Sequence, residues 1–446
     1  MAELLPLLTR DLDGIIAIRH DRQISCREFL VQVATLADAL PAASVAVNLC
    51  DDRYLFMVAF AAAILRDQAN ILLPSRQPAA VKEALEALAD ASILHDGEFA
   101  GLGEAGVDVR AFGESSNSDC GPVPAIPADQ LCAVVFTSGS TGDSTRIEKH
   151  WKTLVEGTSI NARLALHGID VATGVVATVP PWHMYGLEYT VLLPLFNDVR
   201  VYAGNTLFPG DILNALKRTP VDRILVSTPL HLRAIARSGL SFPPVTRVLC
   251  ATAPLSQELA QEVSNLLQTD ICEFYGCSEA GCLASRDPVT TNEWRFFAEF
   301  SIDRSKERVC INAAHLRETV TLADQIEFLE DGRFLLQGRG ADIVKIGGKR
   351  GSIAELTDRL LALNGVVDAV IFRPESDAGR ETRLTALVVC PQRDIKEIRR
   401  DFARSIDSVF VPRPMRAVDA LPRNRTGKLR NADLQRLTDS DTLRDE

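Results

Sequence analysis

The strongest constraint on the fold is an alternation of short apolar runs with helix-length stretches through the first 285 residues. Ser44–Cys50 is typical of a buried strand, and the apolar stretch 54–65 that follows is typical of a buried helix. Strands covered on both faces have continuous apolar runs of this kind. The alternation predicts an α/β fold with a mostly parallel sheet and helices on both faces. Further strands are predicted at Leu131–Phe136, Val175–Val179, Arg223–Ser227, Val245–Ala251 and Ile271–Tyr275.

The pattern changes after about residue 285. Two apolar runs at 326–329 and 333–337 flank Glu330-Asp331-Gly332, which predicts a β-hairpin. Strands are predicted at 366–372 and 384–390, and a helix at 394–405. We therefore expect a large N-terminal domain over residues 1–340 and a small α+β domain over residues 341–446.

Two capping boxes mark expected helix starts. In each, a serine is followed three residues later by a glutamate, so that the two side chains and backbone amides satisfy one another. The first runs from Ser25 to Glu28, with apolar residues at helical spacing behind it and Pro41 to end the helix. The second runs from Ser352 to Glu355 and begins a helix that is expected to continue to Leu363.

Charge and composition narrow the classes of partner. The 446 residues carry 48 Lys and Arg against 59 Asp and Glu, a net charge of −11, which argues against a nucleic-acid surface or an anionic membrane as the main partner. The longest apolar run has 12 residues (54–65), whereas a membrane span needs about 20. We expect no signal peptide, and ten reduced cysteines without a CxxC pair in a cytoplasmic protein.

The segment Thr137-Ser138-Gly139-Ser140-Thr141-Gly142 directly follows a predicted buried strand. Glycine allows close approach to a ligand, backbone N–H groups can line an anion site, and hydroxyls donate to phosphate oxygens. The segment is thus a candidate phosphate loop, the alternative being a polar surface turn. It lacks the lysine motif of P-loop nucleotidases, which makes that class less probable.

Two further segments indicate a shaped pocket. In PPWHMYGL, His183 lies between Trp182 and Tyr185, bracketed by Pro-Pro and Gly; the alternative is a buried structural histidine. In EFYGCSEAG, Ser278 and Glu279 follow the end of a predicted strand. Open α/β sheets bind ligands at that end, and one carboxylate suits a magnesium ion carried by a nucleotide. The alternative here is a solvated loop.

Basic residues gather near the C-terminus. Gly338-Arg339 opens a glycine-rich basic stretch, and LPRNRTGKLR places Lys428 after a Thr-Gly turn. Either run could be only a solvated face.

Taken in order, these five motifs resemble the adenylate-forming enzymes over roughly residues 130–430. That family includes acyl- and aryl-CoA synthetases, nonribosomal adenylation domains and luciferases. The resemblance implies a large N-terminal domain, a small mobile C-terminal domain, and ATP with Mg²⁺ as cofactors. It also implies formation of an acyl-adenylate, whose acyl group then passes to a phosphopantetheine thiol.

The resemblance assigns roles by position. Thr137 to Gly142 would hold phosphates, His183 would gate the acid site, and Glu279 would bind Mg²⁺. Lys428 would be the catalytic lysine, and Gly347-Gly348 would line a pantetheine tunnel. The adenine, phosphate and ribose contacts would come from Ala253 with its neighbours Thr252 and Pro254, and from Tyr275, Gly276, Ser278, Asp324 and Arg339.

The chain departs from the family pattern at four places. The phosphate loop continues as Asp143-Ser144-Thr145-Arg146-Ile147-Glu148-Lys149 instead of Pro-Lys-Gly, so Arg146 or Lys149 would have to supply the cation. Ser278 stands where threonine is usual. Ala341 stands at the customary hinge acid, beside Asp342, within a pivot expected near residues 340–342. The region before the phosphate loop is also short for a CoA ligase.

The substrate is expected to be a small carboxylic acid, and Trp182, His183 and Tyr185 favour an aromatic or hydroxyaromatic one. In size and motif order the chain is similar to hydroxybenzoate:acyl-carrier-protein ligases of aryl-polyene pathways. The thiol acceptor could be CoA or an acyl carrier protein; a carrier protein would favour exposed cations such as Arg373, Arg380, Arg383 and Arg399-Arg400. The alternative function is a non-catalytic nucleotide- or acyl-adenylate-binding module.

Overall fold

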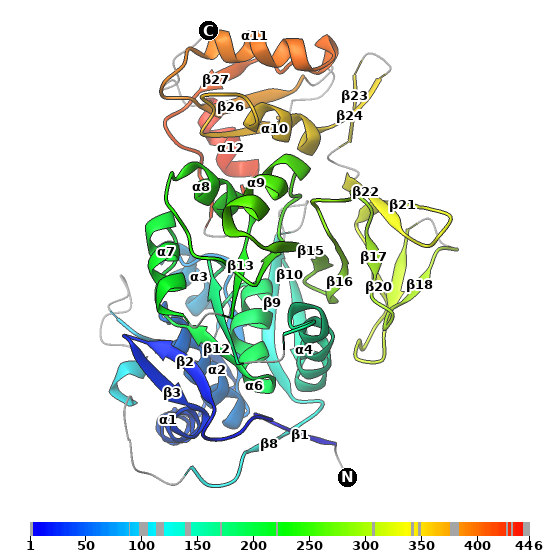
Figure 1. Ribbon diagram of the computed structural model, residues 1–446. Coiled ribbons are helices and arrows are strands. Elements are labelled where there is room, and N and C mark those ends of the chain that lie inside the picture. The colour runs from blue at the N-terminus through cyan, green and yellow to red at the C-terminus, as the bar shows by residue number, and fades with distance from the viewer. Residues whose placement is uncertain are drawn as a thin grey trace. The chain divides into compact units, whose positions relative to one another are not determined.

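A computed structural model describes residues 3–88, 90–97, 106–112, 120–138, 144–169, 172–219, 222–305, 308–339, 343–346, 349–374, 383–424, 427–429 and 431–439. The chain divides into two compact units (Figure 1). The first unit comprises Met1–Ile302 and Ile311–Val320, and the second comprises Asp303–Cys310 and Thr321–Glu446. These two units are defined by how compactly their residues pack. The boundary expected near residue 340 is the point about which the small domain would rotate, which is a different property, so that boundary stays a prediction.

The first sheet of the first unit has six strands in the order β10-β9-β5-β4-β6-β7. Its strands are β4 (Val45–Asn48), β5 (Ala69–Leu72), β6 (Ala91–His95), β7 (Val107–Asp108), β9 (Leu131–Ser138) and β10 (Ser144–His150). All pairings are parallel except that of β10 with β9. The predicted strands at 44–50 and 131–136 are confirmed as β4 and β9.

The second sheet has nine strands in the order β17-β16-β15-β14-β13-β11-β12-β2-β3. They are β2 (Ile15–Arg19), β3 (Arg22–Ser25), β11 (Thr173–Ala177), β12 (Val199–Tyr202), β13 (Arg223–Ser227), β14 (Arg247–Cys250), β15 (Asp270–Cys277), β16 (Gly281–Arg286) and β17 (Arg295–Phe296). The six strands from β15 to β2 are parallel, and both edges are antiparallel. The four strands predicted between residues 175 and 275 are confirmed as β11, β13, β14 and β15.

Helix α2 (Arg53–Leu65) lies in the core of the first unit because it is apolar on every side. It contacts β4 and β5 of the first sheet and β12 of the second. Asp52 caps its start by accepting from the backbone N–H of Tyr54 at 2.9 Å and of Leu55 at 3.0 Å. The prediction of a buried, non-spanning helix at this position is confirmed.

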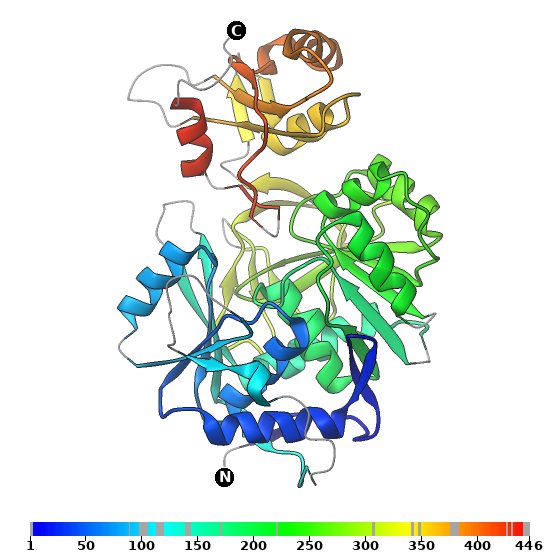
Figure 2. The same ribbon diagram turned by 90° about the vertical axis from the view of Figure 1, so that its left-hand side faces the viewer.

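The first unit contains further helices, and the stretch 184–195 among them is buried. They are α1 (Cys26–Ala39), α3 (Pro78–Ala87), η1 (Val109–Phe112), α4 (Trp151–Ala165), α5 (Met184–Leu187), the π-helix η2 (Glu188–Leu192), α6 (Leu193–Phe196), α7 (Pro209–Arg218), α8 (Pro229–Arg237) and α9 (Gln257–Leu267). Figure 2 shows α1, in blue, running along the lower edge of the first unit. Two short strands, β1 (Leu4–Pro6) and β8 (Ala125–Pro127), pair antiparallel.

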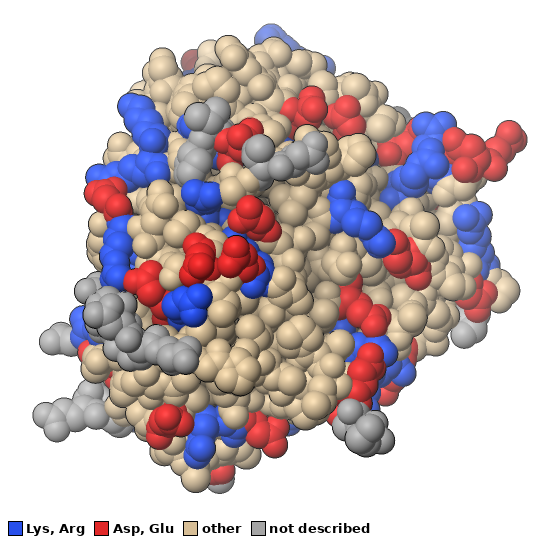
Figure 3. Space-filling model, turned by 60° about the horizontal axis from the view of Figure 1, so that its bottom comes forward, with Lys and Arg blue, Asp and Glu red and all other residues tan. Residues whose placement is uncertain are grey.

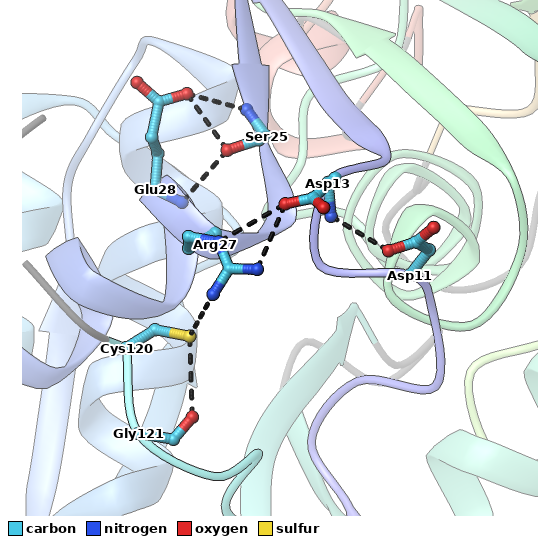
Figure 4. A network of polar contacts seen from close by, with 7 residues as sticks. All are labelled: Asp11, Asp13, Ser25, Arg27, Glu28, Cys120 and Gly121. Carbon is cyan, nitrogen blue, oxygen red and sulfur yellow. Dashed lines mark hydrogen bonds and ion pairs between the residues drawn. The ribbon is translucent and has the colours of Figure 1, made fainter. Parts of the chain in front are cut away.

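The first capping box is confirmed (Figure 4). Ser25 Oγ accepts from the backbone N–H of Glu28 at 3.2 Å, and the Glu28 carboxylate accepts from the backbone N–H of Ser25 at 2.9 Å. Beside it, the Arg27 guanidinium donates to Asp13 at 3.1 Å and to Cys120 Sγ at 3.8 Å. These contacts tie the start of α1 to the loop before β2.

The second unit holds the predicted hairpin, β21 (Asp324–Phe328) with β22 (Phe334–Arg339), and a second hairpin of β23 (Ile343–Ile346) with β24 (Lys349–Ser352). Its three-stranded sheet has the order β25-β26-β27 and packs with two helices around a core that includes Leu360, Val388 and Phe402. These elements are α10 (Ile353–Leu361), β25 (Asp368–Phe372), β26 (Thr385–Val389), α11 (Ile395–Ser405), η4 (Ser408–Phe410), β27 (Met415–Ala417) and α12 (Asn431–Asp439). Between residues 301 and 321 the chain forms a small sheet of β18 (Ser301–Asp303), β19 (Cys310–Asn312) and β20 (Val320–Thr321).

Two sequence-based exclusions can be compared with the structure. Within the described residues, no helix combines the length and apolarity needed to cross a membrane. On the face shown in Figure 3, acidic and basic side chains are interspersed, with no single-sign field over that view.

Candidate functional site

The predicted phosphate loop lies between two strands, β9 and β10, that pair antiparallel. Thr137 and Ser138 end β9 and pair with Thr145 and Ser144 of β10. Gly139, Ser140, Thr141 and Gly142 lie outside the described residues. A strand–loop–strand arrangement differs from the strand–loop–helix of P-loop nucleotidases, which agrees with the missing lysine motif.

The PPWHMYGL segment enters α5 through a tight turn. A Cβ on Gly186 would lie 1.9 Å from the carbonyl oxygen of Pro180, so only glycine allows this approach. His183 is half-buried and occupies the N-cap position of α5. The Arg76 guanidinium lies 3.5 Å from the ring centroid of Trp182, a cation–π contact that holds the indole.

Behind this segment lies a buried arginine that the sequence analysis did not single out. Arg53 donates to the carbonyls of Ala177 and Val179 at 2.9 Å each and to Thr190 Oγ1 at 3.0 Å. Burial lowers the pKa of Arg53 to about 10. These bonds join the carboxyl end of β11 to η2, directly behind the PPWHMYGL segment.

The EFYGCSEAG motif forms the β15–β16 hairpin. Tyr275 and Gly276 lie in β15, while Ser278, Glu279 and Ala280 form the turn. A Cβ on Gly276 would lie 2.2 Å from the carbonyl oxygen of Gly281, so close pairing of the two strands requires glycine there. The ring of Tyr275 meets that of Trp294 edge-on at 5.9 Å.

The carboxylate of Glu279 is exposed at this turn, while its backbone is held from below. Lys149, at the far end of β10, is only 2% exposed and its Nζ donates to the carbonyl oxygen of Glu279 at 2.7 Å. Burial lowers the pKa of Lys149, and the negative charge of Glu188 opposes that effect. Lys149 is thus buried on the turn, whereas Arg146 is exposed and pairs with Glu148 at 3.1 Å; a phosphate-loop role for either cation stays a prediction.

The loop expected beside the adenine leaves the carboxyl end of β14, next to β15 in the sheet. Thr252 has a left-handed backbone (φ 85°), and Ala253 and Pro254 are exposed. The loop ends at Leu255, whose N–H donates to Glu273 at 2.9 Å and whose carbonyl accepts from Arg286 at 2.8 Å. Glu273 and Arg286 themselves form an ion pair at 2.6 Å, with side chains 2% and 7% exposed.

The second unit carries the other predicted residues. Asp324 and Arg339 are register partners across the β21–β22 hairpin, so the two residues assigned to the ribose lie side by side in the backbone. Lys428 is exposed. Two hydrogen bonds connect it to Asn424: the Lys428 N–H donates to Asn424 Oδ1 at 2.8 Å, and the Asn424 N–H donates to the Lys428 carbonyl at 2.9 Å. Gly347-Gly348 and residues 340–342 lie outside the described residues.

The predicted residues thus fall into two groups. His183, Ala253, Tyr275, Gly276, Ser278, Glu279 and the start of the phosphate loop belong to the first unit, and Asp324, Arg339 and Lys428 to the second. In the first unit, the loop after β14 and the β15–β16 turn both lie at the carboxyl edge of the parallel strands, where open α/β sheets bind ligands. The site-residue roles themselves remain predictions.

A magnesium ion fits this arrangement through one carboxylate. Among the residues that the structure describes, no group of three His, Cys, Asp or Glu side chains could hold a metal. Mg²⁺ bound with a nucleotide takes one or two protein carboxylates and otherwise phosphate oxygens and waters. The exposed carboxylate of Glu279, with the Ser278 hydroxyl beside it in the turn, has this chemistry.

A broad open hollow of about 690 Å³ lies elsewhere on the first unit. It is lined by Arg223, Thr246 and Asp270, at the amino ends of β13, β14 and β15, and by the end of α9. This is the opposite edge of the sheet from the predicted residues, so the hollow is not part of the candidate site.

Comparison with known families agrees with the motif order. The model of the AMP-binding enzyme family matches residues 10–296, and that of the AMP-binding enzyme C-terminal domain matches residues 355–428. The 4-coumarate–CoA ligase of Rhodobacter capsulatus is 29% identical over 309 residues, which are 68% of this chain and 75% of that protein. The 3,4-dihydroxybenzoate–[aryl-carrier protein] ligase of Bacillus anthracis is 23% identical over 331 residues, 71% of this chain and 77% of that protein.

Solved structures share the fold over nearly the whole chain. The o-succinylbenzoate CoA synthetase of Bacillus subtilis, with its acyl-adenylate intermediate, has a TM-score of 0.79 at 16% identity and covers 97% of this chain and 96% of its own. An anthranilate CoA ligase in complex with anthranoyl-AMP has a TM-score of 0.78 at 15% identity, with 97% and 98% covered. At this level of identity the likeness concerns the fold alone.

Proposed function

The chain belongs to the AMP-binding enzyme family, and on that premise we propose that it uses ATP to activate a carboxylic acid and then passes the acyl group to a thiol. The observation that carries the proposal is the position of two segments at the same edge of the sheet. The loop 251–255 follows β14, and the turn that bears Glu279 follows the neighbouring strand β15. Both stand at the ligand-binding edge of the sheet.

The proposed reaction has two steps. In the first, a carboxylate oxygen of the acid attacks the α-phosphorus of ATP, the bond to the β-phosphate breaks, and pyrophosphate leaves with the electron pair. In the second, a thiol sulfur attacks the acyl carbon, the bond to AMP breaks, and the thiol proton is released. Attack of one anion on another requires both positioning and neutralised charge.

The residues of this chain would divide these tasks. The backbone amides of the phosphate loop would hold the pyrophosphate end, while Asp324 and Arg339 would hold the ribose. Lys428, as a compact and mobile point charge, would neutralise the phosphate oxygens during attack. Glu279 would hold the nucleotide's magnesium ion, which when bound neutralises further phosphate charge.

For the acid we propose an aromatic or hydroxyaromatic substrate. Tyr185, Tyr189 and Phe274 form a buried aromatic cluster, with ring centroids 5.2 and 5.6 Å apart along the series. Among the described residues, the buried Tyr185 hydroxyl has no hydrogen-bond partner. A hydroxyl left in this state can select a polar ring substituent on a ligand. The 4-coumarate and 3,4-dihydroxybenzoate ligases named above act on acids of this class.

For the acceptor we propose an acyl carrier protein. Arg373, Arg383 and Arg413 are exposed, and strand register brings them to one end of the β25-β26-β27 sheet, because Phe372 pairs with Thr385 and Ala386 with Met415. Clustered cations suit the acidic surface typical of carrier proteins and would speed encounter with one. The carrier ligase of Bacillus anthracis supports this acceptor, and the CoA ligases support the other.

The test of the activity is acid-dependent exchange of labelled pyrophosphate into ATP over a panel of aromatic and aliphatic acids. We expect exchange with at least one hydroxyaromatic acid. Wild type should prefer this acid over the analogue that lacks the ring hydroxyl, and Tyr185→Phe should reduce that preference about tenfold, because one hydrogen bond to the ring substituent would be lost. Absence of exchange across the panel, with ATP still bound, would favour the non-catalytic binding module.

Lys428→Ala should remove exchange while the affinity for ATP stays within several-fold. Normal exchange in this variant would refute the role of the lysine.

The acceptor is tested by offering the adenylate to CoA and to holo-carrier protein side by side. Reversal of charge at Arg373, Arg383 and Arg413 together should raise the KM for the carrier about tenfold and leave pyrophosphate exchange unchanged. Arg399 and Arg400, which the sequence analysis also named as carrier-binding cations, are exposed on α11 rather than at this end of the sheet, so charge reversal there shows whether the effect is confined to the sheet end. Equal use of CoA and carrier would overturn the preference.

A further inference from the structure

We propose that Lys149 is a positioning residue for the Ser278–Ala280 turn, held in place by the buried counter-charge of Glu188, so that it sets the geometry of the Glu279 carboxylate toward the nucleotide's magnesium ion. The inference rests on the proposed function for the identity of that ion. It concerns two residues to which the family resemblance assigned no role of this kind.

The contact itself is direct. Lys149 Nζ donates to the backbone carbonyl of Glu279 at 2.7 Å, across 130 residues of sequence. The lysine lies in β10, the strand that leaves the phosphate loop, and its backbone is opposite Ala133 of β9. One side chain therefore connects the hairpin of the phosphate loop to the turn that carries the metal-binding carboxylate.

The counter-charge comes from a third segment. Glu188 begins the π-helix η2, directly after the PPWHMYGL motif, and is 5% exposed. Its Oε1 lies 2.7 Å from the place a Cβ on Gly281 would occupy, and its Oε2 accepts from Cys282 Sγ at 3.7 Å. Glu188 thus lies against the first residues of β16, immediately after the turn. π-Helical turns occur frequently at functional sites.

Between the two charges the packing is incomplete. Lys149, Glu188, Thr153, Ala280 and Gly281 line a cavity of about 10 Å³, near the lower limit for one water molecule. In Figure 1, α4 and β10 lie beside the β15–β16 hairpin, and α4 contacts β16. The turn therefore packs against a mixed lining, in which the two charged side chains lie among apolar ones such as Leu154, Met184 and Leu192.

Burial of the Lys149 ammonium group costs free energy, which argues that its hydrogen bond to the Glu279 carbonyl serves a function. A buried ammonium loses its hydration, and breaking such a site by removing one charge leaves the other uncompensated. An apolar side chain of similar size would avoid that cost but could not bind the Glu279 carbonyl. Small errors in the placement of a catalytic group reduce rates strongly, so fixing the carbonyl fixes the carboxylate that stands on the same residue.

Two variants separate positioning from folding. Lys149→Met removes the bond to Glu279 and leaves Glu188 buried without its counter-charge. The double variant Lys149→Met with Glu188→Gln also removes that charge, so its thermal midpoint should return toward wild type while the bond stays lost. Lys152→Met is the matched control, because Lys152 lies nearby in α4, has a side chain that is 38% exposed, and pairs with Glu3 at 3.0 Å.

The measurement is calorimetric binding of ATP as a function of Mg²⁺ concentration, together with the thermal midpoint of each variant. We expect both Lys149 variants to need at least tenfold more Mg²⁺ for half-maximal ATP affinity, and ATP affinity without Mg²⁺ to change less than threefold. Lys152→Met should match wild type in both.

A double variant with a restored midpoint and wild-type Mg²⁺ dependence would overturn the proposal and leave Lys149 a purely structural residue. A double variant with the midpoint still low is judged on the same binding curve at a temperature where it is folded. Because binding needs no turnover, a failure of pyrophosphate exchange in wild type would count against the proposed function and not against this inference.

Discussion

The β15–β16 hairpin is held by buried charged side chains at both ends, but the two ends are built differently. At the open end, Glu273 and Arg286 pair directly at 2.6 Å and both also bind the backbone of Leu255. At the turn end, Lys149 binds a carbonyl, and Glu188 balances it across a small cavity. The first arrangement is electrostatically complete, whereas the second leaves Glu188 with a pKa that burial raises to about 7, against the lowering effect of Lys149.

The difference fits the tasks proposed for each end. The open end fixes the loop 251–255, which is expected to lie beside the adenine. Because the shape of the adenine does not change during the reaction, a rigid support suits this loop. The turn end carries Glu279, which should bind a metal whose phosphate partners change when pyrophosphate leaves. Lys149 holds the backbone of this turn, while the exposed side chain of Glu279 can follow the phosphate oxygens.

The largest effect should follow from breaking the open end. Arg286→Met leaves Glu273 charged and buried, so we expect a loss of about 3–5 kcal/mol in the free energy of unfolding, measured by urea denaturation. The exposed Arg295 of the adjacent strand is the control, and Arg295→Met should change stability by less than about 0.5 kcal/mol. A loss below about 1 kcal/mol at Arg286 would mean that the two ends do not differ as described.

Breaking the turn end should cost less. Lys149→Met removes a charge-assisted hydrogen bond, for which we expect about 2–3 kcal/mol. Glu188 can take up a proton once the lysine is gone, so the loss should be smaller at pH 6 than at pH 8. A loss independent of pH, or one larger than that of Arg286→Met, would contradict this ranking.

The pH dependence of the turn end can be isolated with Glu188→Gln. The folded pKa of about 7 lies above the ordinary value of 4.5, so between these two values the folded chain binds more protons than the unfolded chain. The contribution of Glu188 to stability therefore falls as pH rises through this window, by at most about 3 kcal/mol. Glu188→Gln should flatten that part of the stability curve, and a curve parallel to wild type would show that Glu188 titrates normally.

The smallest effect should come from Tyr185, which is buried near β14, β15 and β16 without belonging to either charged end. Since its hydroxyl has no partner among the described residues, Tyr185→Phe should leave stability unchanged within about 0.5 kcal/mol or raise it slightly. A loss above about 1 kcal/mol in urea denaturation would mean that the hydroxyl is bonded in the folded protein.

Most of the α/β framework could be predicted because its signals are local. A continuous apolar run such as 131–136 is the mark of a strand buried on both faces, and the Ser25–Glu28 spacing marks a helix start. Strand β10 was not predicted, because its residues STRIEKH are mostly polar or charged and contain no apolar run. The antiparallel edge strands β3, β16 and β17 were also not predicted, because the direction in which a strand pairs depends on the connection to its neighbour and not on its own residues.

For the candidate site, the motif order predicted which segments would meet, and the structure brings the loop 251–255 and the turn 278–280 to one sheet edge. The sequence analysis did not identify Glu188, Glu273 and Arg286, and it considered Lys149 only as one of two possible phosphate-loop cations, not as a ligand of the Glu279 carbonyl. A lysine or glutamate within a mixed sequence has the same local pattern whether it is solvated or buried.

The family, the framework of strands and helices, and the residue types offered to the nucleotide could be inferred from local patterns, because hydrophobic periodicity, capping and glycine-rich turns act over a few residues. Which charged side chains are buried, and which groups they bind, follows from how the folded chain brings distant segments together. Lys149 reaches Glu279 across 130 residues, and Glu188 reaches Cys282 across 94. Such contacts depend on the order of strands in a sheet, and the free energy of a buried charge depends on the partners that this order places around it.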